Sequence, residues 1–214
     1  MIPAPGECLL YVPQDLPAVG APQRTAHTAC AAYDLARLVP GRTLMLVPSV
    51  TALIEARCAL AGRDPVAWYQ GMLPFDGERA GFEANPRGFL MVLPTWLGEN
   101  PIQDLDVSCL VLEHLPLDAQ PPVGEDQGLE PSPAARPDFL GSVLPQAINT
   151  VSRLAAELAT TYPPRATVLA IMDERITDRS WGRLFLHSLP DVVLGRDLED
   201  VVSYYCRMRA ARRG

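Results

Sequence analysis

The sequence contains no lysine, and its 18 basic residues other than histidine are all arginines. A phosphate-binding loop of the form GxxxxGK(S/T) needs a lysine that reaches the β- and γ-phosphates. Schiff-base chemistry also needs a lysine amine. The chain therefore cannot bind nucleotide phosphates in the Walker A manner, and catalysis through a lysine is excluded.

Long apolar runs are also absent. A membrane-spanning helix needs a run of roughly 18 or more apolar residues, and the sequence has none. The first ten residues, Met1–Leu10, lack the basic start of a secretory signal peptide. We therefore expect a cytoplasmic protein without a membrane partner.

Cysteine pairs with metal-ligand spacing are missing as well. The five cysteines stand at positions 8, 30, 58, 109 and 206, and no two of them are separated by two residues. The three histidines, His27, His114 and His187, are scattered. This pattern predicts buried, reduced thiols in a cytoplasmic protein and no metal site.

The composition indicates a folded chain with an acidic balance. Hydrophobic residues make up 48% of the 214 positions, which is enough for a sizeable core. The formal net charge of −7 excludes a uniformly basic surface for nucleic acid, although a local arginine patch is still allowed.

Short apolar runs alternate with segments of helical periodicity along most of the chain. Proline, glycine and capping residues mark the ends, with Ser49 and Asp197 as expected N-caps and Gly62 as a stop. The stripe expected for the first helix is Ala26, Cys30, Tyr33, Ala36 and Leu38. Strands are predicted at 8–12, 43–47, 66–70, 88–93, 107–113 and 167–172, helices at 23–38, 49–60, 144–161, 181–189 and 197–212, and loops at 94–106 and 119–135.

Continuous apolar strands that alternate with helices are typical of a parallel sheet buried on both faces. We therefore predict one α/β domain over residues 1–214. It should contain a mostly parallel sheet of about five to seven strands, with helices on both faces.

Six segments, taken in order and with their spacing, resemble a known family. The chain is similar, from about Leu9 to about Val193, to the C-terminal RecA-like motor domain of the DinG/XPD-type superfamily two DNA helicases. The resemblance implies a three-layer RecA-like fold. The segments that carry it are Tyr11–Pro17, Arg42–Leu53, Tyr69–Gly71, Gly88–Pro116, Leu144–Ile148 and Val168–Leu189.

The chain departs from the family where the family carries its chemistry. Motif V reads WEGVD in the family; Trp96 and Gly98 match it here, whereas Leu97 and Asn100 stand at the two acidic positions.

Motif VI of the family carries two arginines that face nucleotide held by the other motor domain. By spacing, those positions here are Glu157 and Thr160. A register shifted by four residues would give Arg153 one of these roles, but that shift conflicts with the match at Asp173 and Arg175.

The resemblance therefore implies a degenerate helicase domain. Asn100, Arg153, Glu157 and Thr160 would face nucleotide by motif position, yet none of them is expected to be catalytic. Arginine fingers are worth about 10³–10⁵ in rate, so their loss predicts a chain that is inactive alone. ATP and Mg²⁺ would bind only at an interface with a Walker A-bearing domain or chain.

The resemblance also implies contacts to single-stranded DNA, through loops that follow the strands. Trp96 could stack on a base, which is worth about 1–3 kcal/mol, or it could pack in the core. Ser49 could be only a helix cap, and the arginines could pair with nearby acids. The candidate nucleic-acid residues are Ser49, Thr51, Thr95, Trp96, Arg175 and Arg179.

Three functions are compatible with the sequence. The chain could be part of a helicase system, or a protein-interaction module that kept the RecA-like fold without a motor or nucleic-acid role. It could also be an enzyme of unrelated chemistry, for which the sequence offers no GxSxG, no HExxH and no ordered Cys–His pair.

Overall fold

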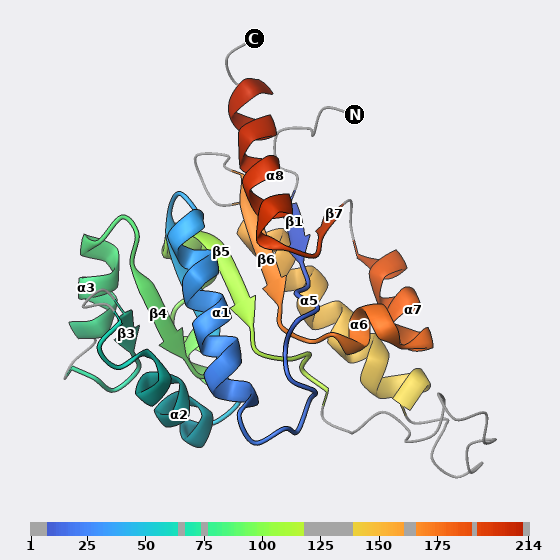
Figure 1. The fold of residues 1–214 in the computed structure, drawn as a ribbon, viewed down its shortest axis with the longest axis horizontal. Helices are drawn as coiled ribbons and strands as arrows, with labels where there is room; N and C mark the ends of the chain where they lie inside the picture. The colour runs from blue at the N-terminus through green and yellow to red at the C-terminus, as the bar shows by residue number, and fades with distance from the viewer. Residues whose placement is uncertain are drawn as a thin grey trace.

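A computed structural model describes residues 8–63, 67–73, 77–117, 139–160, 166–189 and 192–211. Its centre is one sheet of seven parallel strands in the order β3-β4-β2-β5-β6-β1-β7 (Figure 1). The strand bounds are β1 Cys8–Tyr11, β2 Arg42–Leu46, β3 Ala67–Tyr69, β4 Phe89–Val92, β5 Val107–Leu112, β6 Thr167–Ile171 and β7 Val192–Gly195. The predicted parallel α/β architecture is confirmed.

Helices cover both faces of the sheet (Figure 1). One face packs against α1 (Arg24–Leu38), α2 (Val50–Leu60) and α8 (Leu198–Ala211). The other face packs against α3 (Gly77–Ala84), α5 (Leu144–Ala159), α6 (Arg175–Asp178) and α7 (Ser180–Ser188). Three short helices complete this second layer: η1 (Pro94–Gly98) and η2 (Ile102–Asp104) before β5, and η3 (Phe139–Val143) before α5.

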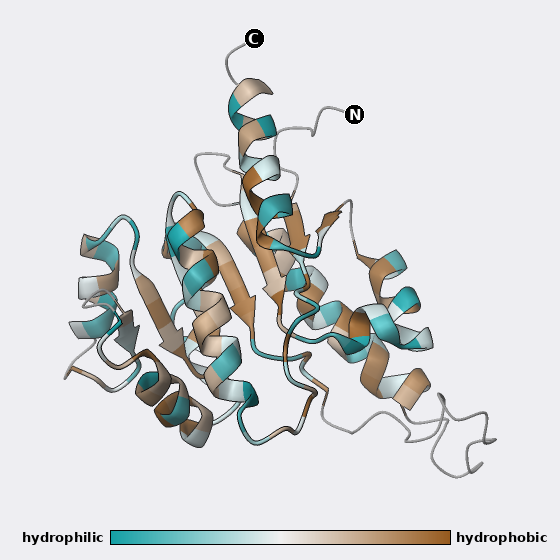
Figure 2. Cartoon of the chain, in the orientation of Figure 1, coloured by the Kyte–Doolittle hydropathy of each residue, from teal (hydrophilic) through white to brown (hydrophobic). Residues whose placement is uncertain are grey.

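The strands divide the core into two layers by simple alternation. Leu9 and Tyr11 of β1 belong to the α1 side, whereas Leu10 and the following Val12 belong to the α5 side. Neighbouring side chains of a strand point to opposite faces. Because both faces are covered, the central strands are buried and mostly apolar, and their hydropathy is evident in Figure 2. Thr43, Ser108 and Thr167 are the polar residues that these strands bury.

The predicted caps are present. The Ser49 hydroxyl accepts a hydrogen bond from the Ala52 amide at 3.1 Å and begins α2. The Asp197 carboxylate accepts one from the Asp200 amide at 2.8 Å and begins α8. Each oxygen satisfies an amide that has no partner within its helix.

Several details differ from the expectation. Helix α3 and strand β7 were not predicted, and the expected loop 94–106 contains η1 and η2. The stripe expected for α1 is correct at Tyr33 and Ala36, which are buried, but wrong at Leu38, which is exposed. Thr28, Ala29 and Ala32 complete the buried side of the helix. The expected loop 119–135 lies outside the described residues. Within the described ranges, no helix is both long and apolar enough to cross a bilayer.

Candidate functional site at the carboxyl ends of the strands

A cleft of about 790 Å³ opens beside the carboxyl ends of β2, β4 and β5. Ligand sites of open parallel sheets lie outside the carboxyl ends of strands, where successive connections leave toward opposite faces. β2 leads to α2 on one face, and its neighbour β5 leads toward α5 on the other. The cleft lies at such a position. Its lining is Leu46, Val47, Pro48, Pro94, Thr95, Leu97, Gly98, Pro101, Leu112, His114, Leu115, Pro116, Leu117, Thr150, Arg153, Leu154 and Glu157.

Helix α5, at the position expected for motif VI, supplies one wall of the cleft. Thr150, Arg153, Leu154 and Glu157 share one side of the helix because residues three and four apart lie above one another. Arg153 Nη1 lies 2.5 Å from Glu157 Oε1, with the two side chains 62% and 27% exposed. The guanidinium is therefore neutralised by a carboxylate of the same wall.

The η1–η2 segment, which contains motif V, supplies the opposite wall. Thr95 is exposed and lines the cleft, while the Trp96 side chain is buried in the core. Asn100 is also buried: its Oδ1 accepts from Arg79 Nη1 at 2.7 Å, and its Nδ2 donates to the Trp96 carbonyl at 3.1 Å. Trp96 therefore packs in the core rather than lying open to a base. Asn100 stabilises the turn through its hydrogen bonds to Arg79 and to the Trp96 carbonyl.

The remaining motif residues lie outside the cleft lining. Thr160 ends α5 and donates its hydroxyl to the Glu157 carbonyl at 2.9 Å. Ser49 caps α2, and Thr51 is exposed in the first turn of that helix. The structure therefore brings Thr95, Arg153 and Glu157 together at the cleft, but not Asn100, Thr160, Ser49 or Thr51. Their proposed roles toward nucleotide and DNA stay predictions.

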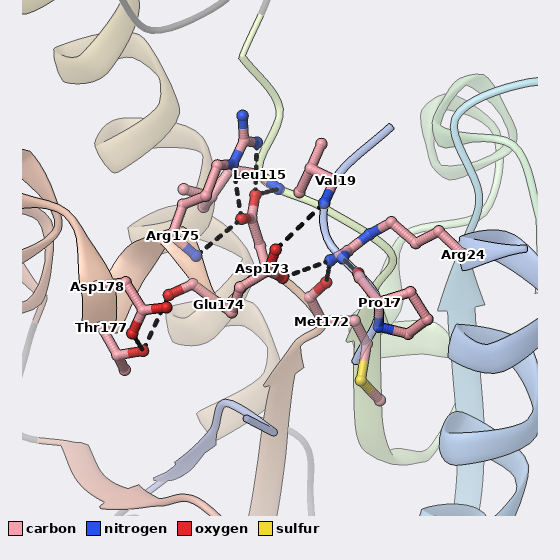
Figure 3. Close-up of polar contacts among 10 residues, drawn as sticks. All are labelled: Pro17, Val19, Arg24, Leu115, Met172, Asp173, Glu174, Arg175, Thr177 and Asp178. Atoms are coloured by element: carbon pink, nitrogen blue, oxygen red, sulfur yellow. Dashed lines mark hydrogen bonds and ion pairs between the residues drawn. The ribbon is translucent and has the colours of Figure 1, made fainter. Parts of the chain in front are cut away.

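A second polar cluster lies at the carboxyl end of β6 (Figure 3). Asp173 is fully buried and forms a two-pronged ion pair with Arg175, with Nε–Oδ1 at 2.8 Å and Nη2–Oδ2 at 2.7 Å. The Leu115 amide also donates to Asp173 Oδ2 at 3.2 Å. Burial alone raises the pKa of Asp173, but the hydrogen bonds and charge of Arg175 outweigh it, so the pKa lies below its ordinary value.

Arg24 and Glu174 tie the start of α1 to the same edge (Figure 3). Arg24 Nη2 lies 2.9 Å from Glu174 Oε2, and the guanidinium donates to the carbonyls of Pro17 and Met172. The Val19 amide donates to Glu174 Oε1 at 3.2 Å. Sequence reasoning missed this pair because its members lie far apart in the chain and match no motif.

Glu113 and His114 follow β5 between these two polar regions. Glu113 Oε1 accepts from the Thr25 hydroxyl at 2.7 Å. Burial raises the pKa of Glu113, against the opposing effects of that hydrogen bond and of the Arg24 charge. Burial also lowers the pKa of His114, which lines the cleft. A neutral imidazole therefore adds no positive charge there.

Two arginines at this edge, Arg24 and Arg175, form ion pairs with carboxylates of the protein. Arg175 binds Asp173, and the Arg179 amide donates to the Arg175 carbonyl at 3.0 Å, between α6 and α7. In the part of the chain that the structure describes, no three histidine, cysteine or carboxylate side chains gather into a possible metal site.

Among comparisons with known proteins, those with solved structures identify the fold. No family model matches the chain, and no curated protein matches it. An XPD helicase structure superposes with a TM-score of 0.60 at 12% identity over 90% of this chain and 36% of its own. The C-terminal domain of the DEAD-box protein Dbp5 superposes with a TM-score of 0.53 at 11% identity, over 95% of this chain and 98% of that domain. The DExH-box NTPase HrpB of E. coli gives a TM-score of 0.48 at 14% identity, over 81% of this chain and 20% of its own.

The chain therefore has the RecA-like fold of a helicase C-terminal domain. It spans about a third of the XPD helicase chain and nearly all of the Dbp5 domain.

Proposed function

We propose that this chain is a DinG/XPD-like second motor domain that does not hydrolyse ATP and that acts by binding a partner ATPase through its cleft. The observation that carries the proposal is the Arg153–Glu157 pair on the cleft wall of α5. The partner would supply the Walker A motif that a chain without lysine lacks.

This wall offers no unpaired positive charge for phosphoryl transfer. An arginine finger works because its free charge stabilises charge that develops on the transferred phosphoryl group. Arg153 is paired with Glu157, so a phosphate near Arg153 would also meet a carboxylate. Hydrolysis at this wall is therefore disfavoured, and binding is the function that is left.

A protein partner suits the cleft better than single-stranded DNA does. Leucine, valine and proline dominate the lining, and Arg153 is the one arginine among the lining residues. Binding to a phosphate backbone depends on several uncommitted cations. The apolar lining equally favours the second candidate, a protein-interaction module with no motor partner. In either case, the free cysteines fit a reducing, cytoplasmic setting.

Purification of the tagged protein from its own cells tests the proposal. Mass spectrometry should identify a Walker A-bearing polypeptide, or a Walker A domain on the same polypeptide. The variant Leu97→Asp places a charge in the cleft. If the Walker A motif lies on a separate polypeptide, this variant should no longer co-purify with it. Val202→Asp makes the same change on the exposed side of α8 and should keep it.

Three results would count against the proposal. ATP hydrolysis by the purified chain alone would contradict the inactive assignment. Recovery without any Walker A polypeptide would favour the interaction module instead. Tight, salt-dependent binding of a single-stranded oligonucleotide would show that the nucleic-acid role was undervalued.

A further inference from the structure

The two walls of the cleft differ in charge. On α5, Arg153 and Glu157 balance one another. On the opposite wall, Glu99 stands between the lining residues Gly98 and Pro101, and Asp104 follows in η2. Both side chains are exposed, and no cation pairs with either of them in the described ranges.

The arginine that reaches this wall is already engaged. Arg79 donates to Asn100 at 2.7 Å and also forms an ion pair with Glu83 at 2.8 Å. Glu99 and Asp104 therefore carry two negative charges that no described residue balances, next in sequence to the lining residues Gly98 and Pro101.

We infer that the cleft binds a basic, apolar segment of a partner polypeptide, in which arginine or lysine alternates with leucine, valine or proline. Apolar side chains of the segment would cover the leucines and prolines of the lining and remove them from water. Its cations would meet Glu99, Asp104 and Glu157. The inference names the chemistry of the partner in the proposed function, but it does not depend on ATP hydrolysis.

The Arg153–Glu157 pair can exchange partners on binding. The Arg153 side chain is 62% exposed, so it reaches solvent easily, whereas Glu157 is 27% exposed and stays at the wall. A partner cation can therefore replace Arg153 at the Glu157 carboxylate. Exposed pairs of this kind are weak, so the exchange costs little.

Two acetylated, amidated heptapeptides, PLRLPRL and PLELPEL, test the charge preference. Titration into the ¹⁵N-labelled full chain at low salt should shift the amide signals of Leu97, Gly98 and Thr150 with the basic peptide. The acidic peptide should shift them far less. Raising the salt to about 0.5 M should weaken the basic peptide, because exposed charges are screened.

Variants of the acidic residues show which side chains cause the preference for the basic peptide. Glu157→Gln should weaken the basic peptide about two- to five-fold, and Glu99→Gln with Asp104→Asn should weaken it further. Glu199→Gln removes the same charge from the exposed first turn of α8 and should change nothing. Circular dichroism checks that every variant is folded.

Several outcomes would overturn the inference: no binding of either peptide at millimolar concentration, equal binding of both, or an effect of Glu199→Gln as large as that of Glu157→Gln. Shifts of the same cleft signals with MgATP would show a nucleotide site instead. The proposed function fails separately, when no Walker A polypeptide accompanies the native protein although the basic peptide still binds.

Discussion

Replacement of Arg24 tests how firmly α1 is tied to the edge of the sheet. Arg24 and Glu174 have side chains only 7% and 16% exposed, and the guanidinium also serves the carbonyls of Pro17 and Met172. In Arg24→Gln, the Glu174 carboxylate is left buried without its countercharge. Loss of one member of a buried pair costs about 3–5 kcal/mol.

The matched control removes an arginine from an exposed pair. Arg153→Gln breaks the contact to Glu157, in which the arginine is 62% exposed, and it should cost about 0.2–1 kcal/mol. The double variant Arg24→Gln/Glu174→Gln removes both buried charges. It should therefore be less destabilised than Arg24→Gln alone, because no unpaired carboxylate is left.

Urea denaturation followed by circular dichroism measures these differences. With a slope of about 2 kcal/mol per molar urea, Arg24→Gln should lower the midpoint by about 1.5–2.5 M. Arg153→Gln should lower it by less than about 0.5 M. If Arg24→Gln shifted the urea midpoint as little as Arg153→Gln does, the assignment of Arg24 to a stabilising buried ion pair would be refuted.

Three further predictions follow from burial and close approach. Because burial raises the pKa of Glu113, its ionisation lowers the free energy of unfolding as the pH rises through that pKa. Glu113→Gln should therefore be more stable than the native protein at pH 7 and equally stable near pH 4. Urea midpoints at the two pH values measure the difference. A Cβ at Gly182 would lie 2.0 Å from the Ile176 carbonyl oxygen, so Gly182→Ala should cost about 1–3 kcal/mol in thermal or urea unfolding, whereas Gly98→Ala, which meets nothing within 4 Å, should cost far less. A thiol reagent should label the exposed cysteines of the native protein quickly and the buried ones only after denaturation. Burial also raises the pKa of one buried cysteine, Cys8, to about 11, which slows its reaction further. Rapid labelling of the buried cysteines in the native protein would contradict the packing. The buried thiols are Cys8 and Cys109. Cys58 and Cys206 are exposed and Cys30 is half-buried, so the expectation that all five cysteines are buried is wrong.

Local sequence signals predicted most of the sheet because they are strong where strands are buried on both faces. β2 and β5 are mostly apolar, and the helix that follows β2 begins at a clear cap, Ser49. Helix α3 escaped detection because Phe82 is the one apolar side chain that it buries. Strand β7 escaped because it has four residues and lies at the edge, only partly buried.

The site was harder to predict than the fold. Motif spacing indicated Glu157 and Thr160, and the structure places Glu157 but not Thr160 along the cleft. Arg153, which only a shifted register indicated, and Thr95, expected in the loop after a strand, also line it. Spacing could not show that Asn100 would turn inward to bind Arg79, because that contact depends on α3. The Arg24–Glu174 pair joins the start of α1 to the end of β6, and such long-range pairs leave no periodic trace in a sequence.

The position of β1 constrains how the chain can be made. β1 lies between β6 and β7, and its residues pair with 167–170 on one side and 192–195 on the other. A ribosome releases β1 long before either partner, so this apolar strand waits unpaired while most of the chain is synthesised. Contacts between such distant segments slow folding. The pairing of β1 with β6 and β7, next to one edge of the sheet, therefore forms late. A chain interrupted before β7 would leave β1 as an exposed apolar edge strand, which favours aggregation.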